Sequence, residues 1–204
     1  MFPKFVSECG GVSRTSETGT RSFTLPRGRS LPYNDPMIHV CPLSCLHRTV
    51  KDSGAHYVVT LLKDIDLVRR PDTIAPANHL ILGMDDITEP LTGYVAPADE
   101  HVTKLIAFVQ RWNRAKPLVI HCYAGISRST AGAFVAACAL NPQRDETSIA
   151  RALRQVSPTA TPNIRIVSLA DRVLGRKGRM TSAIEMIGRG EPAMEAEPFR
   201  LPVE

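Results

Sequence analysis

The sequence predicts an α/β fold in which a mostly parallel central sheet is flanked by helices on both faces. Two observations lead to this fold class. Short apolar runs of strand length alternate along the chain with longer segments whose apolar residues recur at helical spacing. Strands that alternate with helices in this way pair as parallel neighbours, with the helices packed on the sheet. We therefore expect ligands to bind at the carboxyl ends of the strands.

The first half of the chain carries most of the predicted strands. Residues 1–36 are rich in Gly, Ser, Thr, Arg and Pro and lack periodicity, so we expect them to form a disordered extension. The apolar runs at 37–41, 57–62 and 79–82 predict short strands, and residues 42–53 predict a short helix. Prolines and charged residues between the last two of these strands indicate a loop.

The second half is predicted to be mainly helical. Pro97 opens a long helix, with two acids in its first turn and an apolar stripe behind them. The run 118–121 is a strand, and residues 129–140, almost all small and apolar, predict a buried helix. Three further helices are expected at 146–156, 164–174 and 178–187. These elements define a domain at 37–187, followed by a loose C-terminal tail at 188–204 that contains three prolines.

Composition narrows the class of protein. Hydrophobic residues make up 43% and charged residues 22% of the chain, as in globular domains. A net charge of +5 favours anionic substrates, but no dense Lys/Arg block indicates a nucleic-acid partner. No apolar run is long enough to cross a bilayer, so no membrane partner is expected. Five cysteines without a secretory signal favour reduced thiols and a cytoplasmic location. Cys41 and Cys45 lack a second Cys/His pair, so no metal is expected.

The stretch His-Cys-Tyr-Ala-Gly-Ile-Ser-Arg-Ser at 121–129 carries the most specific signal. It joins a central strand to a buried helix, and such a loop can point its backbone N–H groups at a phosphate. Cys122 then lies at the bottom of the loop and Arg128 at its rim, and a buried structural cysteine would not explain this spacing. Six residues are expected to form the phosphate-binding loop: Tyr123, Ala124, Gly125, Ile126, Ser127 and Arg128.

A cysteine and an arginine at these positions suit the chemistry of a phosphate monoester. Arg128 can bind two phosphate oxygens with its planar guanidinium. The loop amides and the helix dipole favour the Cys122 thiolate, which is the nucleophile. Ser129 can donate a hydrogen bond to the sulfur when the thiolate leaves. His121 is expected to orient the loop and not to act as a base, since a thiolate needs none.

The departing oxygen of the ester also needs a proton. The segment 84–90 directly follows the strand at 79–82 and so lies at the same edge of the sheet. It offers three candidate acids, Asp85, Asp86 and Glu89. Any one of them could instead be a solvated loop residue.

The motif His121-Cys122-x-x-Gly125-x-x-Arg128-Ser129 resembles the active-site motif of the cysteine-dependent protein tyrosine phosphatase superfamily. The order of the two loops, with an acidic loop upstream and the cysteine loop near the middle of the chain, resembles the dual-specificity branch. The amino-acid sequences of both loops are similar to those of small bacterial members. The resemblance covers about residues 37–175. It implies a central sheet with helices on both sides, no metal or other cofactor, and a two-step reaction through a phosphocysteine.

The resemblance also implies roles for residues outside the loop. Asp86 aligns with the general acid of the family, and Asp85 is the alternate. The segment 157–163 resembles the proline–asparagine turn of the family, so Asn163 is expected to brace the loop as well as to cap a helix. The loop has no Lys or additional Arg before Arg128, which disfavours highly charged inositol phosphates.

Three functions remain open from the sequence. The first is a phosphatase for phosphotyrosine, with phosphoserine and phosphothreonine as further substrates, in a phosphorylated protein or peptide. The second is a phosphatase for a non-protein monoester such as a lipid, a nucleotide or an RNA 5′ end. The third is a pseudophosphatase that binds phosphate without turnover; the presence of nucleophile, arginine, hydroxyl and acid together argues against it.

Overall fold

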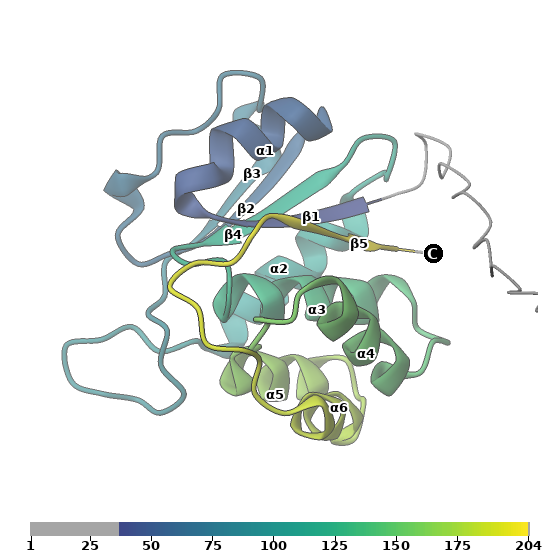
Figure 1. Ribbon diagram of the computed structural model, residues 1–204. Coiled ribbons are helices and arrows are strands. Elements are labelled where there is room, and N and C mark those ends of the chain that lie inside the picture. The colour runs from purple at the N-terminus through teal and green to yellow at the C-terminus, as the bar shows by residue number, and fades with distance from the viewer. Residues whose placement is uncertain (1–36, 204) are drawn as a thin grey trace, which may run out of the picture. The chain divides into compact units, whose positions relative to one another are not determined.

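A five-stranded sheet organises residues 37–203, the part of the chain that the computed structural model describes (Figure 1). The strands lie in the order β3-β2-β4-β1-β5; β1 to β4 are parallel and β5 is antiparallel to β1. Their bounds are β1 Met37–Pro42, β2 Tyr57–Leu61, β3 His79–Leu82, β4 Leu118–Cys122 and β5 Phe199–Pro202. The predicted fold class is confirmed, and the four parallel strands begin where the sequence places them.

Six α-helices cover the sheet. Their bounds are α1 Leu46–Ser53, α2 Asp99–Arg111, α3 Arg128–Leu140, α4 Glu146–Val156, α5 Ile164–Val173 and α6 Arg179–Ile187. Figure 1 shows α1 on one face of the sheet and the other five on the opposite face, as the two separate groups of buried side chains require. The helix predicted over 42–53 is shorter, because Pro42 is extended and a 3-10 turn at Leu43–Cys45 precedes α1.

The core lies around β4 and α3, the two elements that flank the 121–129 motif. All five residues of β4 are buried, and every residue of α3 except Ala139 is buried as well. A Cβ on Gly132 would lie 2.8 Å from Cδ1 of Leu61 and 3.2 Å from Cγ2 of Ile120. Helix α3 therefore packs very close to the sheet. Because β4 before the loop and α3 after it are both closely packed, the loop between them is held in place.

The C-terminal segment differs from the loose tail that the sequence predicts. Residues 199–202 form β5, which pairs with β1 at the edge of the sheet, and Leu201 and Val203 are buried. Pro198 and Pro202 flank or end this strand, and prolines are tolerated at the edge of a sheet. The short alternation of Phe199 and Leu201 was too brief to stand out as a strand in the sequence.

The prediction for the N-terminal residues cannot be compared with the structure, and the membrane prediction can be compared only within residues 37–203. The disordered extension expected at residues 1–36 lies outside the described residues. Within the part that is described, no helix is long and apolar enough to cross a membrane.

Candidate active site

The loop between β4 and α3 turns its carbonyl groups outward. Four of its carbonyl oxygens accept hydrogen bonds from backbone N–H groups elsewhere: Leu43 N to Tyr123 O (3.0 Å), Ala196 N to Ala124 O (2.9 Å), Thr161 N to Ile126 O (3.0 Å) and Asn163 N to Ser127 O (3.3 Å). Within the described chain, the N–H groups of residues 124–128 donate to no protein acceptor. Unpaired N–H groups at the start of a helix form an anion-binding site.

Gly125 is the residue that allows the loop to close. Its φ is +75°, a backbone conformation that favours glycine. A Cβ at this position would lie 2.8 Å from the backbone nitrogen of Pro42 and 3.0 Å from the carbonyl carbon of Cys41. The loop therefore rests against the end of β1, and any side chain at Gly125 would push it away.

Cys122 and Arg128 lie at the two ends of this loop. Cys122 is the last residue of β4, and its Sγ is 3.1 Å from Oγ of Ser129 in the first turn of α3. Arg128 is 8% exposed and donates one hydrogen bond from its terminal nitrogen to the carbonyl of Met84, at 2.8 Å. Its Nε is buried and has no hydrogen-bond partner in the described part of the chain. The guanidinium is thus anchored on one side and keeps donors available for an anion.

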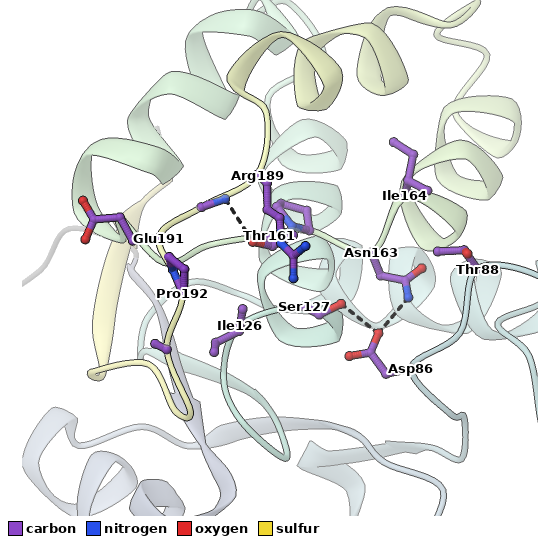
Figure 2. Close-up of a pocket in the computed structure, with 13 residues that line it drawn as sticks. Asp86, Thr88, Ile126, Ser127, Thr161, Asn163, Ile164, Arg189, Glu191 and Pro192 are labelled. Carbon is purple, nitrogen blue, oxygen red and sulfur yellow. Dashed lines mark hydrogen bonds between the residues drawn. The ribbon is translucent and has the colours of Figure 1, made fainter.

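Asp86 is the acid that the fold brings to the loop. Its Oδ1 accepts hydrogen bonds from Oγ of Ser127 (2.7 Å) and Nδ2 of Asn163 (2.8 Å), as Figure 2 shows. Its Oδ2 lies 3.8 Å from Nε of Arg128. The side chain is 37% exposed, so one carboxylate oxygen is held by the loop while the carboxylate still meets solvent.

Asp85 and Glu89 occupy different positions from Asp86. Oδ2 of Asp85 accepts a hydrogen bond from the backbone N–H of Val95 (2.7 Å) and pairs with Nζ of Lys63 (3.4 Å). The backbone N–H of Asp85 also donates to the Val95 carbonyl (2.8 Å). Asp85 therefore closes the neck of the loop between β3 and α2. Glu89 lies exposed farther along this loop.

Asn163 joins three parts of the site. Its Oδ1 caps α5 by accepting from the N–H groups of Arg165 (3.1 Å) and Ile166 (3.2 Å). Its backbone N–H donates to Ser127 and its Nδ2 donates to Asp86. Asn163 thus caps the helix with its side-chain oxygen and holds the loop with its backbone N–H. Its side-chain amide also binds Asp86, a contact that the sequence did not indicate.

His121 lies beneath the loop in a short chain of polar side chains. Its Nε2 is 2.7 Å from Oγ1 of Thr60, which is 2.8 Å from Nε2 of His79. Burial lowers the pKa of His121 to about 4, so the imidazole is neutral near pH 7. Sequence reasoning missed Thr60 and His79, although a threonine inside an apolar strand opposite His121 was a usable signal.

The remaining predicted residues lie on or around the loop. Tyr123 is 58% exposed at the rim. A cavity of about 530 Å³ adjoins Asp86 and Ser127, and residues 189–193 of the C-terminal segment line it (Figure 2).

Burial raises the pKa of the Cys41 thiol to about 12, so this neighbouring cysteine stays protonated. No cluster of His, Cys, Asp or Glu in the described chain could hold a metal ion.

Comparisons with known proteins match part of the sequence and the overall fold. The sequence model of the family described as protein-tyrosine phosphatase matches residues 93–160. No curated protein matches the chain significantly. The structure of PTP-2 phosphatase from Cydia pomonella is 21% identical, with a TM-score of 0.53 over 66% of this chain and 84% of that one.

Two further solved structures share the fold. DUSP15 is 15% identical, with a TM-score of 0.55 over 74% of this chain and 92% of that one. PTPMT1 in complex with PI(5)P is 14% identical, with a TM-score of 0.51 over 67% of this chain and 88% of that one. At these identities the structures establish a shared fold, while the motif at 121–129 and its hydrogen bonds belong to this chain itself.

Proposed function

We propose that this chain belongs to the cysteine-dependent protein tyrosine phosphatase superfamily, in its dual-specificity-like branch, and that it hydrolyses phosphotyrosine in proteins through a phosphocysteine. The observation that carries this proposal is the arrangement around the loop. The N–H groups of residues 124–128 and Nε of Arg128 have no partner in the described chain, and the sulfur of Cys122 lies at the start of the same loop. We assign the phosphatase domain to residues 37–203, which adds the C-terminal segment to the predicted 37–187.

In the first step, the Cys122 thiolate attacks phosphorus and the bond from phosphorus to the ester oxygen breaks. The loop amides and Arg128 stabilise the charge on the phosphoryl oxygens. Asp86, 3.8 Å from Nε of Arg128 at the edge of the loop, gives its proton to the leaving oxygen. Cys122 attacks as a thiolate, so no side chain has to accept a proton from it. The neutral, buried His121 therefore needs no role as a base.

In the second step, water attacks the phosphocysteine and the phosphorus–sulfur bond breaks. Asp86, now ionised, takes the proton of the attacking water. Ser129, 3.1 Å from the sulfur, donates a hydrogen bond to the departing thiolate. Inorganic phosphate and the free thiolate enzyme are the products. The proton that Asp86 gave to the leaving alcohol or phenol in the first step is replaced by the proton that it takes from water in the second.

Phosphotyrosine is preferred in this proposal for two reasons. The loop carries no cation between Cys122 and Arg128, so the highly charged headgroup of an inositol phosphate gains little there. The exposed ring of Tyr123 at the rim offers a flat surface for an aromatic substrate. A phosphoinositide is the second candidate, because the fold is shared with PTPMT1, which was solved with PI(5)P. A cytoplasmic location suits the free thiols of Cys122 and the other described cysteines.

A substrate profile tests the proposal. p-Nitrophenyl phosphate, a phosphotyrosine peptide, a phosphoserine peptide, a phosphoinositide and a 5′-phosphorylated RNA are compared by kcat/KM. We expect the highest value for the phosphotyrosine peptide, and we expect Cys122→Ser to abolish turnover without unfolding the protein. A higher value for the lipid or the RNA would reassign the substrate. Absence of turnover on every substrate would indicate a pseudophosphatase.

A further inference from the structure

The C-terminal segment that follows α6 is fixed beside the catalytic loop by one arginine. The guanidinium of Arg154 donates hydrogen bonds to the carbonyls of Ile187 (3.1 Å), Gly188 (2.9 Å) and Arg189 (3.3 Å). It also donates to the carbonyl of Ala160 (2.7 Å), in the turn before Asn163. One planar side chain thus joins this turn to the start of the C-terminal segment.

The next residues of the segment are held by backbone contacts. The N–H of Gly190 donates to Oγ1 of Thr161 (3.1 Å), and the N–H of Glu191 donates to the carbonyl of Pro158 (3.0 Å). A Cβ on Gly190 would lie only 2.5 Å from the carbonyl carbon of Thr159. The close backbone approach and the hydrogen bonds give this stretch a defined position.

This placement builds the second wall of the 530 Å³ cavity beside the active site. The cavity opens next to Asp86 and Ser127, and Ile126 and Ile164 add apolar surface. Figure 2 shows the side chain of Arg189 reaching from the C-terminal segment toward Ser127. A group bound near Arg189 would therefore belong to the same substrate whose phosphate lies in the loop.

The charges in the cavity favour an anion at Arg189. Its guanidinium makes no hydrogen bond or ion pair with any of the residues 37–203. Asp86, across the cavity, is already bound by Ser127 and Asn163. The carboxylate of Glu191 points away from Arg189 in Figure 2. An exposed arginine with no side-chain partner in the described part of the chain, beside the proposed phosphate site, is thus available to a second acidic group.

We propose that Arg189 selects phosphotyrosine substrates that carry an Asp or Glu side chain close to the phosphorylated residue. This proposal rests on the proposed function, because it requires the phosphate of a peptide in the loop. The apolar surface of Ile126 and Ile164 packs against the stem of the acidic residue, and the guanidinium binds its carboxylate. Arg189 is then a specificity residue and takes no part in the chemical steps.

Two matched peptides and two matched variants test this role. The peptides are identical phosphotyrosine sequences with either Glu or Gln beside the phosphotyrosine. The variants are Arg189→Gln and, as a control, Arg200→Gln, since Arg200 is an exposed arginine of the same C-terminal segment on β5. The two variants carry the same net charge, so a general electrostatic effect would appear in both.

We expect the wild type to prefer the Glu peptide by about 3- to 10-fold in kcat/KM, as for a partly solvated ion pair. Arg189→Gln is expected to lower this ratio to about 1, whereas Arg200→Gln keeps it. Added salt lowers the wild-type ratio, because the pair meets solvent. Hydrolysis of p-nitrophenyl phosphate, which has no second acidic group, stays the same in all three proteins.

The outcomes separate the two proposals. Equal rates on the two peptides, or a ratio that both variants reduce alike, would overturn the role of Arg189 and leave the phosphatase proposal standing. No hydrolysis of either peptide would overturn both. If Arg189→Gln instead lowers only the hydrolysis of the phosphoinositide used in the substrate profile, the residue binds a lipid headgroup and the peptide proposal is overturned.

Discussion

The replacement Asp86→Asn tests the least obvious residue assignment in the proposed site. The amide keeps an oxygen where Oδ1 accepts from Ser127 and Asn163, so the positions of these groups should persist. What the variant lacks is a carboxylic proton for the leaving oxygen. Loss of a general acid lowers the rate by roughly 10²- to 10⁴-fold.

The structural cost of the same replacement is small. The carboxylate lies 3.8 Å from Nε of Arg128, and its side chain is 37% exposed. Asp86 itself meets solvent and the amide keeps both hydrogen bonds at Oδ1, so we expect a loss of about 1 kcal/mol of stability. The expected fall in rate is therefore far larger than the change in stability can explain, and a thermal melt measured on the same sample checks this.

The assay compares aryl phosphates whose phenols differ in acidity. A good leaving group departs without a proton, while the phenolate of a tyrosine needs one. The deficit of Asp86→Asn should therefore be smallest for p-nitrophenyl phosphate and grow toward phosphotyrosine. Asp85→Asn should show no such trend, because Asp85 binds Val95 and Lys63 at the loop neck. A deficit that is uniform across the series, or one that appears with Asp85→Asn instead, would refute the assignment.

Three other changes should have distinct effects. Ser129→Ala should slow the second step, so that phosphocysteine accumulates and a burst of phenol precedes steady turnover. Gly125→Ala should lower the free energy of unfolding by about 1–3 kcal/mol for its φ of +75°, measured in urea, and should reduce activity more, because the loop must move from Pro42. Burial lowers the pKa of His121 from 6.5 to about 4, so between these pH values the unfolded chain binds a proton that the folded chain does not. The stability that comes from burying the neutral imidazole is therefore complete above pH 6.5. It falls as the pH drops toward 4, by up to about 3 kcal/mol. Urea unfolding at several pH values should show a weaker acid dependence in His121→Asn than in the wild type, and equal slopes would contradict this.

The regular elements could be predicted because their physical signals are local. The apolar stripe of α2 and the uniformly small residues of α3 specify helices without reference to distant parts of the chain. The strand–loop–helix around Cys122 has a fixed spacing of chemical groups, which composition alone would not produce. These signals were enough for the fold class and for the position of the 121–129 loop between a strand and a helix.

The proposal of Asp86 over Asp85 as the general acid required the structure. Asp85 and Asp86 are neighbours, and the sequence offers the same carboxylate twice. The choice between them depends on Val95, whose backbone binds Asp85, and on Asn163, whose amide binds Asp86. Both partners lie far along the chain from the two acids or across a loop, so no local pattern could distinguish them.

The second wall of the cavity was missed for a similar reason. Residues 188–198 contain two glycines and two prolines, which are typical of a tail, and their defined position comes from Arg154 and from contacts with the turn at 158–161. Likewise, the polar chain from His121 through Thr60 to His79 crosses three strands. Such contacts depend on sheet order, which the sequence pattern does not specify.

The pairing of β5 with β1 also has a consequence for synthesis of the protein. Met37 pairs with Pro202, and the Ala196 N–H donates to the carbonyl of Ala124 in the loop between β4 and α3. The ribosome must therefore translate past residue 202 before the sheet gains its last strand. Contacts so distant along the chain form slowly. A nascent chain that already contains Cys122 should thus lack the contact that holds Ala124 in place until its late segment arrives, and the proposed activity should appear only after that segment has been translated.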